Sequence, residues 1–145
     1  MTTINKSALV AYSAAQMYAL VNDINAYSDF LPWCNRSEVL SRTGNTVEAT
    51  LELHKGALSK TFTTRNTITK NESIDIELLG GPFRHLAGSW KFQALGEEGS
   101  KVSLHLEFEF ESRMVDMMFG AFFEETCNSL VDAFTRRAVD IYGQR

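Results

Sequence analysis

The chain has 145 residues, of which 44% are hydrophobic and 22% are charged, and its formal net charge is -4. This length and composition fit a single globular domain, residues 1–145, with a sizeable core. No apolar run approaches the roughly 18 residues of a membrane-spanning helix, and the first ten residues lack the hydrophobic centre of a signal peptide. We therefore expect a cytoplasmic protein. Its two cysteines, Cys34 and Cys127, are too few for a disulfide scaffold, so reduced thiols are expected.

The charges are distributed unevenly along the chain. Residues 1–95 carry nine basic and eight acidic groups, whereas residues 96–145 carry five and ten. The negative total argues against broad nonspecific binding of nucleic acid. An anionic partner would have to contact the first part of the chain.

The first predicted elements are a strand over residues 4–11 and two short helices. Ser13 and Gln16 form a capping-box pattern, and Tyr12 and Met17 have the spacing of a hydrophobic staple. These signals predict a helix over residues 14–22. A second, shorter helix is expected over residues 25–30, ending before Pro32, because the residue before a proline disfavours the helical conformation.

Alternating apolar and polar residues then predict strands. The runs with this pattern or with strand-type composition are 47–54, 61–69, 73–78, 90–94 and 102–110. Turn residues at 44–45, 70–72 and 96–99 join neighbouring runs, which indicates a meander of about six antiparallel strands.

The last part of the chain, residues 113–142, reads as one long amphipathic helix. Ser112 can cap its start, and Gly143 can end it. One face has helical spacing and carries Phe119, Phe123, Cys127, Leu130, Phe134, Ala138 and Ile141. We expect this face to pack on the sheet face that bears Leu51, Leu53, Trp90, Phe92, Leu104, Leu106 and Phe108. A helix of roughly 45 Å needs such a broad sheet.

This order predicts an α+β fold in which a curved antiparallel sheet wraps around the last helix and can leave a cavity. The arrangement resembles the helix-grip fold of the START and Bet v 1-like (SRPBCC) superfamily. Within it, residues 27–34, YSDFLPWC, are similar to the Y-x-x-F-L-P-W-C signature of the coenzyme Q-binding START family, also called polyketide cyclase-like. Its bacterial branch is named for the ribosome association toxin RatA. Gly81-Pro82-Phe83 with Trp90, and Phe119-Gly120, add to the resemblance; Ser28 stands where the family often has proline.

The resemblance implies non-enzymatic binding of a hydrophobic ligand, ubiquinone or another isoprenoid lipid, in a cavity between the sheet and the C-terminal helix. Such a carrier would support respiration, would need no cofactor besides the bound quinone, and could contact membranes transiently. The residues expected to contact the ligand are Tyr27, Phe30, Leu31, Pro32, Trp33, Leu53, Phe62, Phe83, Trp90, Phe108, Phe119, Phe123, Cys127 and Leu130.

A different function is implied by the RatA branch, namely binding to the large ribosomal subunit and interference with subunit association. The basic residues available to meet rRNA phosphates are Arg36, Arg42, Lys55, Lys60, Arg65, Lys70, Arg84 and Lys91. Six acidic residues are interspersed with them, so an ordinary solvated sheet face is the alternative interpretation. The two functions do not exclude each other.

No catalytic residue or metal site is predicted. His54, His85 and His105 are far apart in sequence, and no carboxylate or cysteine stands at metal or triad spacing from them. The motif aromatics and Cys34 also have a simpler interpretation as core packing. Three methionines, Met114, Met117 and Met118, are either core filler or an apolar lip at the cavity entrance.

Overall fold

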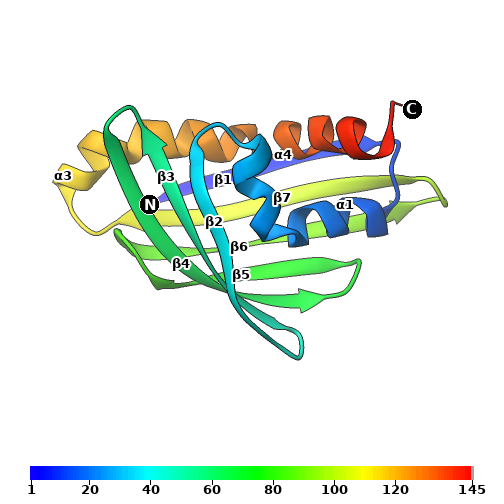
Figure 1. Cartoon of the computed structure of the whole chain (residues 1–145), viewed down its shortest axis with the longest axis horizontal. Helices are drawn as coiled ribbons and strands as arrows, with labels where there is room; N and C mark the ends of the chain where they lie inside the picture. The colour runs from blue at the N-terminus through cyan, green and yellow to red at the C-terminus, as the bar shows by residue number, and fades with distance from the viewer. Residues whose placement is uncertain (145) are drawn as a thin grey trace.

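The computed structural model describes residues 1–144 as one antiparallel sheet with a long C-terminal helix lying along it (Figure 1). The elements in chain order are β1 (Thr2–Val10), α1 (Ala14–Asn22), the 3-10 helix η1 (Ile24–Ala26), α2 (Tyr27–Phe30), β2 (Cys34–Thr43), β3 (Thr46–Lys55), β4 (Leu58–Thr69), β5 (Ser73–Gly80), β6 (Phe83–Leu95), β7 (Gly99–Phe110), α3 (Arg113–Val115), the π-helix η2 (Asp116–Gly120) and α4 (Ala121–Tyr142). None of the helices in this part of the chain is long and apolar enough to cross a membrane.

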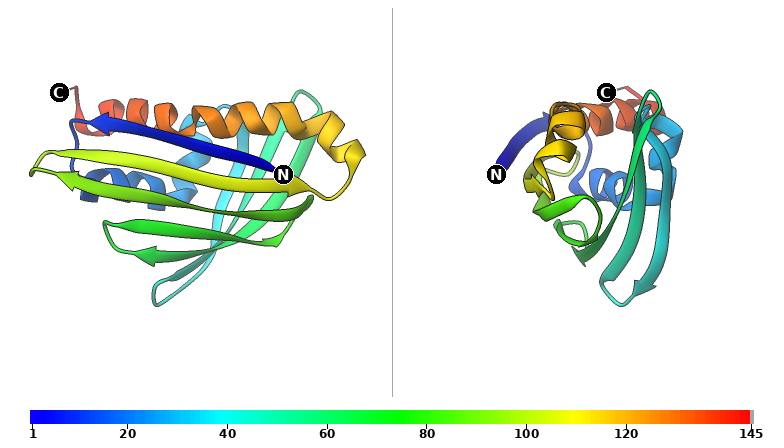
Figure 2. Two further views of the ribbon diagram at one scale, coloured as in Figure 1. Left: turned by 180° about the vertical axis from the view of Figure 1, so that it is seen from behind. Right: turned by 90° about the vertical axis from the view of Figure 1, so that its left-hand side faces the viewer.

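The sheet has seven strands in the order β1-β7-β6-β5-β4-β3-β2. Every neighbouring pair is antiparallel. The first strand, β1, forms one edge of the sheet and pairs with the last strand, β7. Figure 2 shows that the sheet is strongly twisted, so that β2–β4 turn across the molecule while β1 runs beside α4. The expected α+β helix-grip architecture is confirmed, and its curvature leaves the concave face toward the helices.

Helix α1 has the predicted bounds, and the second helix ends at Phe30 as predicted, but its α-helical part begins at Tyr27 rather than at residue 25, after the 3-10 turn η1. The Ser13 hydroxyl accepts a hydrogen bond from the Gln16 backbone N–H at 3.1 Å, and the Gln16 side chain accepts one from the Ser13 N–H at 2.9 Å. The capping box is therefore confirmed. Helix α2 ends at Phe30, and Leu31 is extended before Pro32, as the steric effect of proline predicts.

The C-terminal helix runs from Arg113 to Tyr142 with one irregularity, the π-helix η2. The predicted apolar face is buried along most of its length. The prediction that Ile141 belongs to this face is wrong, because the residue is 51% exposed. Tyr142 turns inward instead, with its ring centroid 6.0 Å from that of Tyr12. Both positions fall close to the stripe at 3.6 residues per turn, and the tyrosine buries the larger side chain.

The packing of this helix on the predicted sheet face is confirmed. The cluster nearest α1 contains Tyr12, Met17, Trp90, Phe92, Leu104, Val131, Phe134 and Ala138. The cluster at the other end contains Leu53, Phe62, Phe83, Leu106, Phe108, Phe110, Phe119, Phe123 and Cys127. Of the two interpretations of the methionines, core filler is wrong, since Met114, Met117 and Met118 are 56–80% exposed. None of the three lines the cavity described below.

Candidate functional site: an apolar cavity under the C-terminal helix

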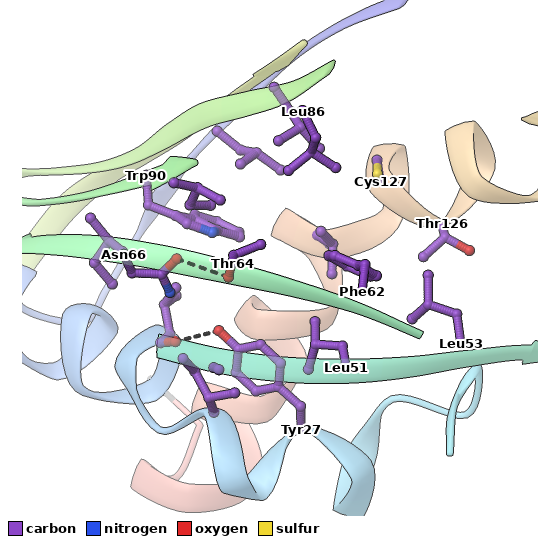
Figure 3. A pocket seen from close by; sticks show the side chains of 18 of the residues that line it. Tyr27, Leu51, Leu53, Phe62, Thr64, Asn66, Leu86, Trp90, Thr126 and Cys127 are labelled. Atoms are coloured by element: carbon purple, nitrogen blue, oxygen red, sulfur yellow. Dashed lines mark hydrogen bonds between the residues drawn. The ribbon is translucent and has the colours of Figure 1, made fainter. Parts of the chain in front are cut away.

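A cavity of about 100 Å³ lies between the concave face of the sheet, α4 and the segment from α1 to α2 (Figure 3). It is lined by Val21, Ile24, Tyr27, Trp33, Ala49, Leu51, Leu53, Phe62, Thr64, Asn66, Ile74, Ile76, Leu86, Trp90, Leu104, Leu106, Phe123, Thr126, Cys127, Leu130 and Phe134. The sheet contributes most of this wall, and α4 contributes the roof.

The cavity lining contains no Asp, Glu, Lys, Arg or His side chain among the described residues. An ionised group without a partner is very costly to transfer into such an environment. The lining therefore favours an uncharged, mostly hydrophobic occupant.

Two polar residues of β4, Thr64 and Asn66, interrupt this apolar wall. They follow Phe62 on the inward-facing side of the strand, and their side chains are 9% and 8% exposed. The Thr64 hydroxyl donates a 3.1 Å hydrogen bond to the amide oxygen of Asn66. This hydrogen-bonded pair lies in a mostly apolar lining, in which Thr126 of α4 is a further buried polar residue.

Tyr27 borders the cavity from α2 and is held in place by several contacts. Its hydroxyl donates a hydrogen bond to the Val21 backbone carbonyl (Figure 3), and its ring lies edge-on to Phe134 at 5.3 Å between centroids. Burial raises the pKa of Tyr27 far above its ordinary value, and the nearby Asp23 carboxylate raises it further. The phenol therefore stays protonated and acts as a hydrogen-bond donor.

The two cysteines have the high thiol pKa values that are typical of unreactive, buried cysteines. Burial raises the pKa of the Cys34 thiol to about 11, and it also raises the pKa of Cys127, which lines the cavity. Both are free thiols. Because the thiolate is the nucleophilic form, neither is prepared for covalent chemistry at neutral pH.

Trp33 lines both the cavity and a groove on the outside of the molecule. The outer groove has a volume of about 500 Å³ and lies between the α2–β2 connection and α4. It is lined by Phe30, Leu31, Pro32, Trp33, Ser129, Ala133, Arg136, Arg137, Val139 and Asp140. On its rim, the Arg137 guanidinium lies 4.7 Å from the centre of the Phe30 ring.

Comparison with known proteins places this geometry in a family. Residues 10–135 match the family described as polyketide cyclase / dehydrase and lipid transport. The chain belongs to this family. The ribosome association toxin RatA of Escherichia coli K12 is 45% identical over 145 residues, covering 100% of this chain and 92% of the relative. The mitochondrial coenzyme Q-binding protein COQ10 homolog B of Xenopus laevis is 30% identical over 146 residues, covering 97% of this chain and 59% of the relative.

A solved structure supports the fold assignment. The Zhui aromatase/cyclase from Streptomyces sp. R1128 superposes with a TM-score of 0.83 and covers 99% of each chain, at 18% sequence identity. At that identity the likeness concerns the fold alone. The resemblance read from residues 27–34 to the polyketide cyclase-like family is confirmed.

In this member of the family, the residues predicted to contact a ligand fall into three groups. Those that line the cavity are Tyr27, Trp33, Leu53, Phe62, Trp90, Phe123, Cys127 and Leu130. Three that line only the outer groove are Phe30, Leu31 and Pro32. Three that pack in the core beyond the cavity are Phe83, Phe108 and Phe119.

Several lining residues are not among those predicted to contact a ligand. Val21 and Ile24 come from the first helices, and Phe134 comes from α4. Thr64 and Asn66 are also missed, and the only feature of the sequence that could have indicated them is their position. They lie on the same side of the strand as Phe62 and Ile68.

The histidines lie outside the cavity. His105 and Glu107 are neighbours on the outer side of β7, with Nε2 and Oε1 at 3.1 Å, and His85 Nε2 lies 4.0 Å from the same carboxylate. Sequence spacing alone misses these pairs. Among residues 1–144, no group of three His, Cys, Asp or Glu side chains has a geometry that could hold a metal ion.

Several of the basic residues considered for rRNA have partners within the chain. Arg36, Arg65 and Arg84 each face a carboxylate within 4 Å. Lys55 instead lies 5.9 Å from the centre of the Phe122 ring, at the end of the sheet near α4.

Proposed function

We propose that this protein binds an uncharged hydrophobic molecule of the isoprenoid quinone class in the cavity beneath α4, without catalysing a reaction. The observation that carries the proposal is the cavity lining, which is apolar and contains no charged side chain within the described residues. Burial of hydrocarbon there would supply the binding energy, at roughly 0.8 kcal/mol per CH2 group. The name of the COQ10 homolog is consistent with such a ligand.

The size of the cavity constrains how such a ligand would bind. An apolar cavity of about 150 Å³ accommodates benzene, whereas pockets for drug-sized ligands span about 300–1,000 Å³. The cavity of about 100 Å³ is smaller than both, so a ring would need it to expand and a prenyl chain would need much more room. We infer that the ring occupies an expanded cavity while the tail leaves past Trp33 into the outer groove.

A non-catalytic role is supported by the chemistry of the lining. General acid–base catalysis needs a group that exchanges protons near the working pH. The titratable side chains that line the cavity are Tyr27 and Cys127, and burial raises the pKa of both. The proposal is therefore a carrier or chaperone.

Quinone binding can be tested directly because the two tryptophans of the chain, Trp33 and Trp90, both line the cavity. Titration with a short-chain ubiquinone should quench their fluorescence saturably, and the affinity should change little with salt because the ligand is uncharged. Trp33→Phe and Trp90→Phe would separate the two signals. Linear, non-saturating quenching would contradict the proposal. Native mass spectrometry of protein from its own host would identify a copurified quinone.

Association with the large ribosomal subunit is a second candidate, favoured by the 45% identity to the E. coli protein named ribosome association toxin RatA across the whole chain. Cosedimentation with large subunits should then weaken steeply as salt rises. Reversing Lys55, Lys60, Arg65 and Lys70 to glutamate should abolish it, while Lys101→Glu, outside this set, should not. Sedimentation without quinone binding would make this the principal function.

A further inference from the structure

The polar pair in β4 gives the cavity a chemically distinct end. Asn66 is buried among Ile74, Ile76 and other apolar lining residues, yet its amide can form more hydrogen bonds than the structure supplies. Burying an amide without all of its partners opposes folding. A bound ligand that completes these hydrogen bonds would offset that cost.

The hydrogen bond inside the pair determines which atoms face the cavity. Because the Thr64 hydroxyl donates to the Asn66 amide oxygen, the amide nitrogen is left with two N–H groups. Neither that nitrogen nor the Trp90 indole nitrogen has a side-chain or backbone acceptor among residues 1–144. In this part of the chain, every side-chain nitrogen or oxygen that is completely buried has a hydrogen-bond partner. The Asn66 amide nitrogen and the Trp90 indole nitrogen are therefore not fully enclosed, and both residues line the cavity (Figure 3).

The cavity thus offers donors that lack acceptors. The Tyr27 hydroxyl is already committed to the Val21 carbonyl. A carboxylate ligand would satisfy the donors but would meet no cation in the described lining, which makes its desolvation costly. An uncharged acceptor has no such cost.

The geometry points to Asn66 as the specificity-determining residue of the cavity: with Thr64 holding its amide, it selects uncharged ligands that carry a carbonyl acceptor, such as a ketone, an ester or a quinone. This inference rests on the proposed function, since it assumes that the cavity holds a hydrophobic ligand.

The same register gives the ligand a direction. Asn66 pairs with Val47 on β3, whereas the Trp33 carbonyl accepts a hydrogen bond from the His54 N–H near the other end of that strand. Seven residues of strand separate the two positions, or roughly 23 Å. The carbonyl end of the ligand lies at Asn66, and its hydrocarbon part extends toward Trp33 and the outer groove.

Acetophenone and cumene test this selection as a matched pair, because a carbonyl oxygen in one replaces a methyl group in the other. Their affinities would be measured by displacement of a hydrophobic fluorescent dye from the wild type, Asn66→Leu, Thr64→Val and the control Thr67→Val, whose side chain is exposed on the opposite side of β4. Asn66→Leu should weaken acetophenone about three- to tenfold and leave cumene within about twofold. Thr64→Val should weaken acetophenone about twofold, and Thr67→Val should change neither.

The result that would overturn the inference is an Asn66→Leu protein in which both ligands change equally or not at all, which would make the pair a structural feature only. A second measurement does not depend on a variant: the side-chain amide resonances of Asn66 in an NMR spectrum of the wild type should shift with acetophenone and not with cumene. If neither ligand binds the wild type saturably, the proposed hydrophobic cavity function itself fails. If both bind without this difference, only the selection by Asn66 fails.

Discussion

The Tyr142 hydroxyl donates a 3.0 Å hydrogen bond to the backbone carbonyl of Gln16 and so joins the last turn of α4 to α1. Tyr12 reinforces this contact, since its hydroxyl donates to the Gly143 carbonyl at 2.6 Å. The C-terminal end of the helix is thereby fastened to the first helix of the chain, beyond the end of the cavity.

Tyr142→Phe removes this hydrogen bond and keeps the ring. We expect the free energy of unfolding to fall by about 1 kcal/mol, the typical net value of one such bond. Urea denaturation measures this change. Tyr18→Phe is the control, because no hydrogen bond of the Tyr18 hydroxyl is found within residues 1–144, and it should have almost no effect. Equal effects in the two variants would show that the Tyr142 contact adds no stability.

Trp33→Ala removes the side chain that the cavity and the outer groove share, and past which we infer that the ligand enters. A short-chain ubiquinone should associate faster because the barrier is gone, and should bind about tenfold more weakly because the indole contact, worth about 1.4 kcal/mol, is lost. Stopped-flow quenching of Trp90 reports both quantities. Pro32→Ala changes the groove alone and should leave the association rate unaltered. An unchanged rate in Trp33→Ala would place the access route elsewhere.

Phe123 and Phe108 test the boundary between cavity and core. Their rings are 4.8 Å apart, edge to face, and both are buried, but only Phe123 lines the cavity. Phe108→Ala should lower the free energy of unfolding by about 4 kcal/mol, and Phe123→Ala by about 3 kcal/mol, because one side of Phe123 already faces empty space. Quinone affinity should change clearly in Phe123→Ala alone. Denaturation and quinone titration of both variants decide this, and indistinguishable behaviour would argue that the cavity stays closed.

Alkaline pH should destabilise the fold through Cys34. Burial raises the pKa of this thiol from 9.0 to about 11, so the folded chain keeps the proton at pH values where the unfolded chain has lost it. Stability should be insensitive to this group below about pH 8 and should fall as pH rises from about 9 to about 11. Cys34→Ala should show a shallower decline in urea denaturation under reducing conditions. Parallel pH profiles would contradict the prediction.

The parts of the fold that the sequence predicts are those with a regular buried side. The strand β7 alternates from Val102 to Phe110 because one face packs under α4, and that pattern is visible without a structure. Strand β2 is not visible, because its pairing with β3 shifts register twice and Leu40 is 53% exposed. A broken alternation carries little signal.

The cavity itself is less predictable than its surroundings. Phe83 and Phe123 look alike in sequence, yet Phe83 stacks on Phe110 in the core while Phe123 also faces the cavity. That difference depends on how the strands and α4 pack in three dimensions, which a residue pattern does not encode. Asn66 is also hidden, since a polar residue in a threonine-rich strand normally indicates the solvent-facing side.

The two register shifts in β2 also affect how the molecule meets others of its kind. As one of the two edge strands of the sheet, β2 has backbone N–H and C=O groups that could template an additional strand. The Val39 N–H is already bonded to the Asn25 side chain at 2.8 Å. The shifts at Cys34/Arg36 and Val39/Ser41 break that row at two places, and the charged side chains of Arg36, Glu38 and Arg42 project from it. A strand from a second molecule would find no long continuous ladder to join, so the open edge is protected against intermolecular sheet growth.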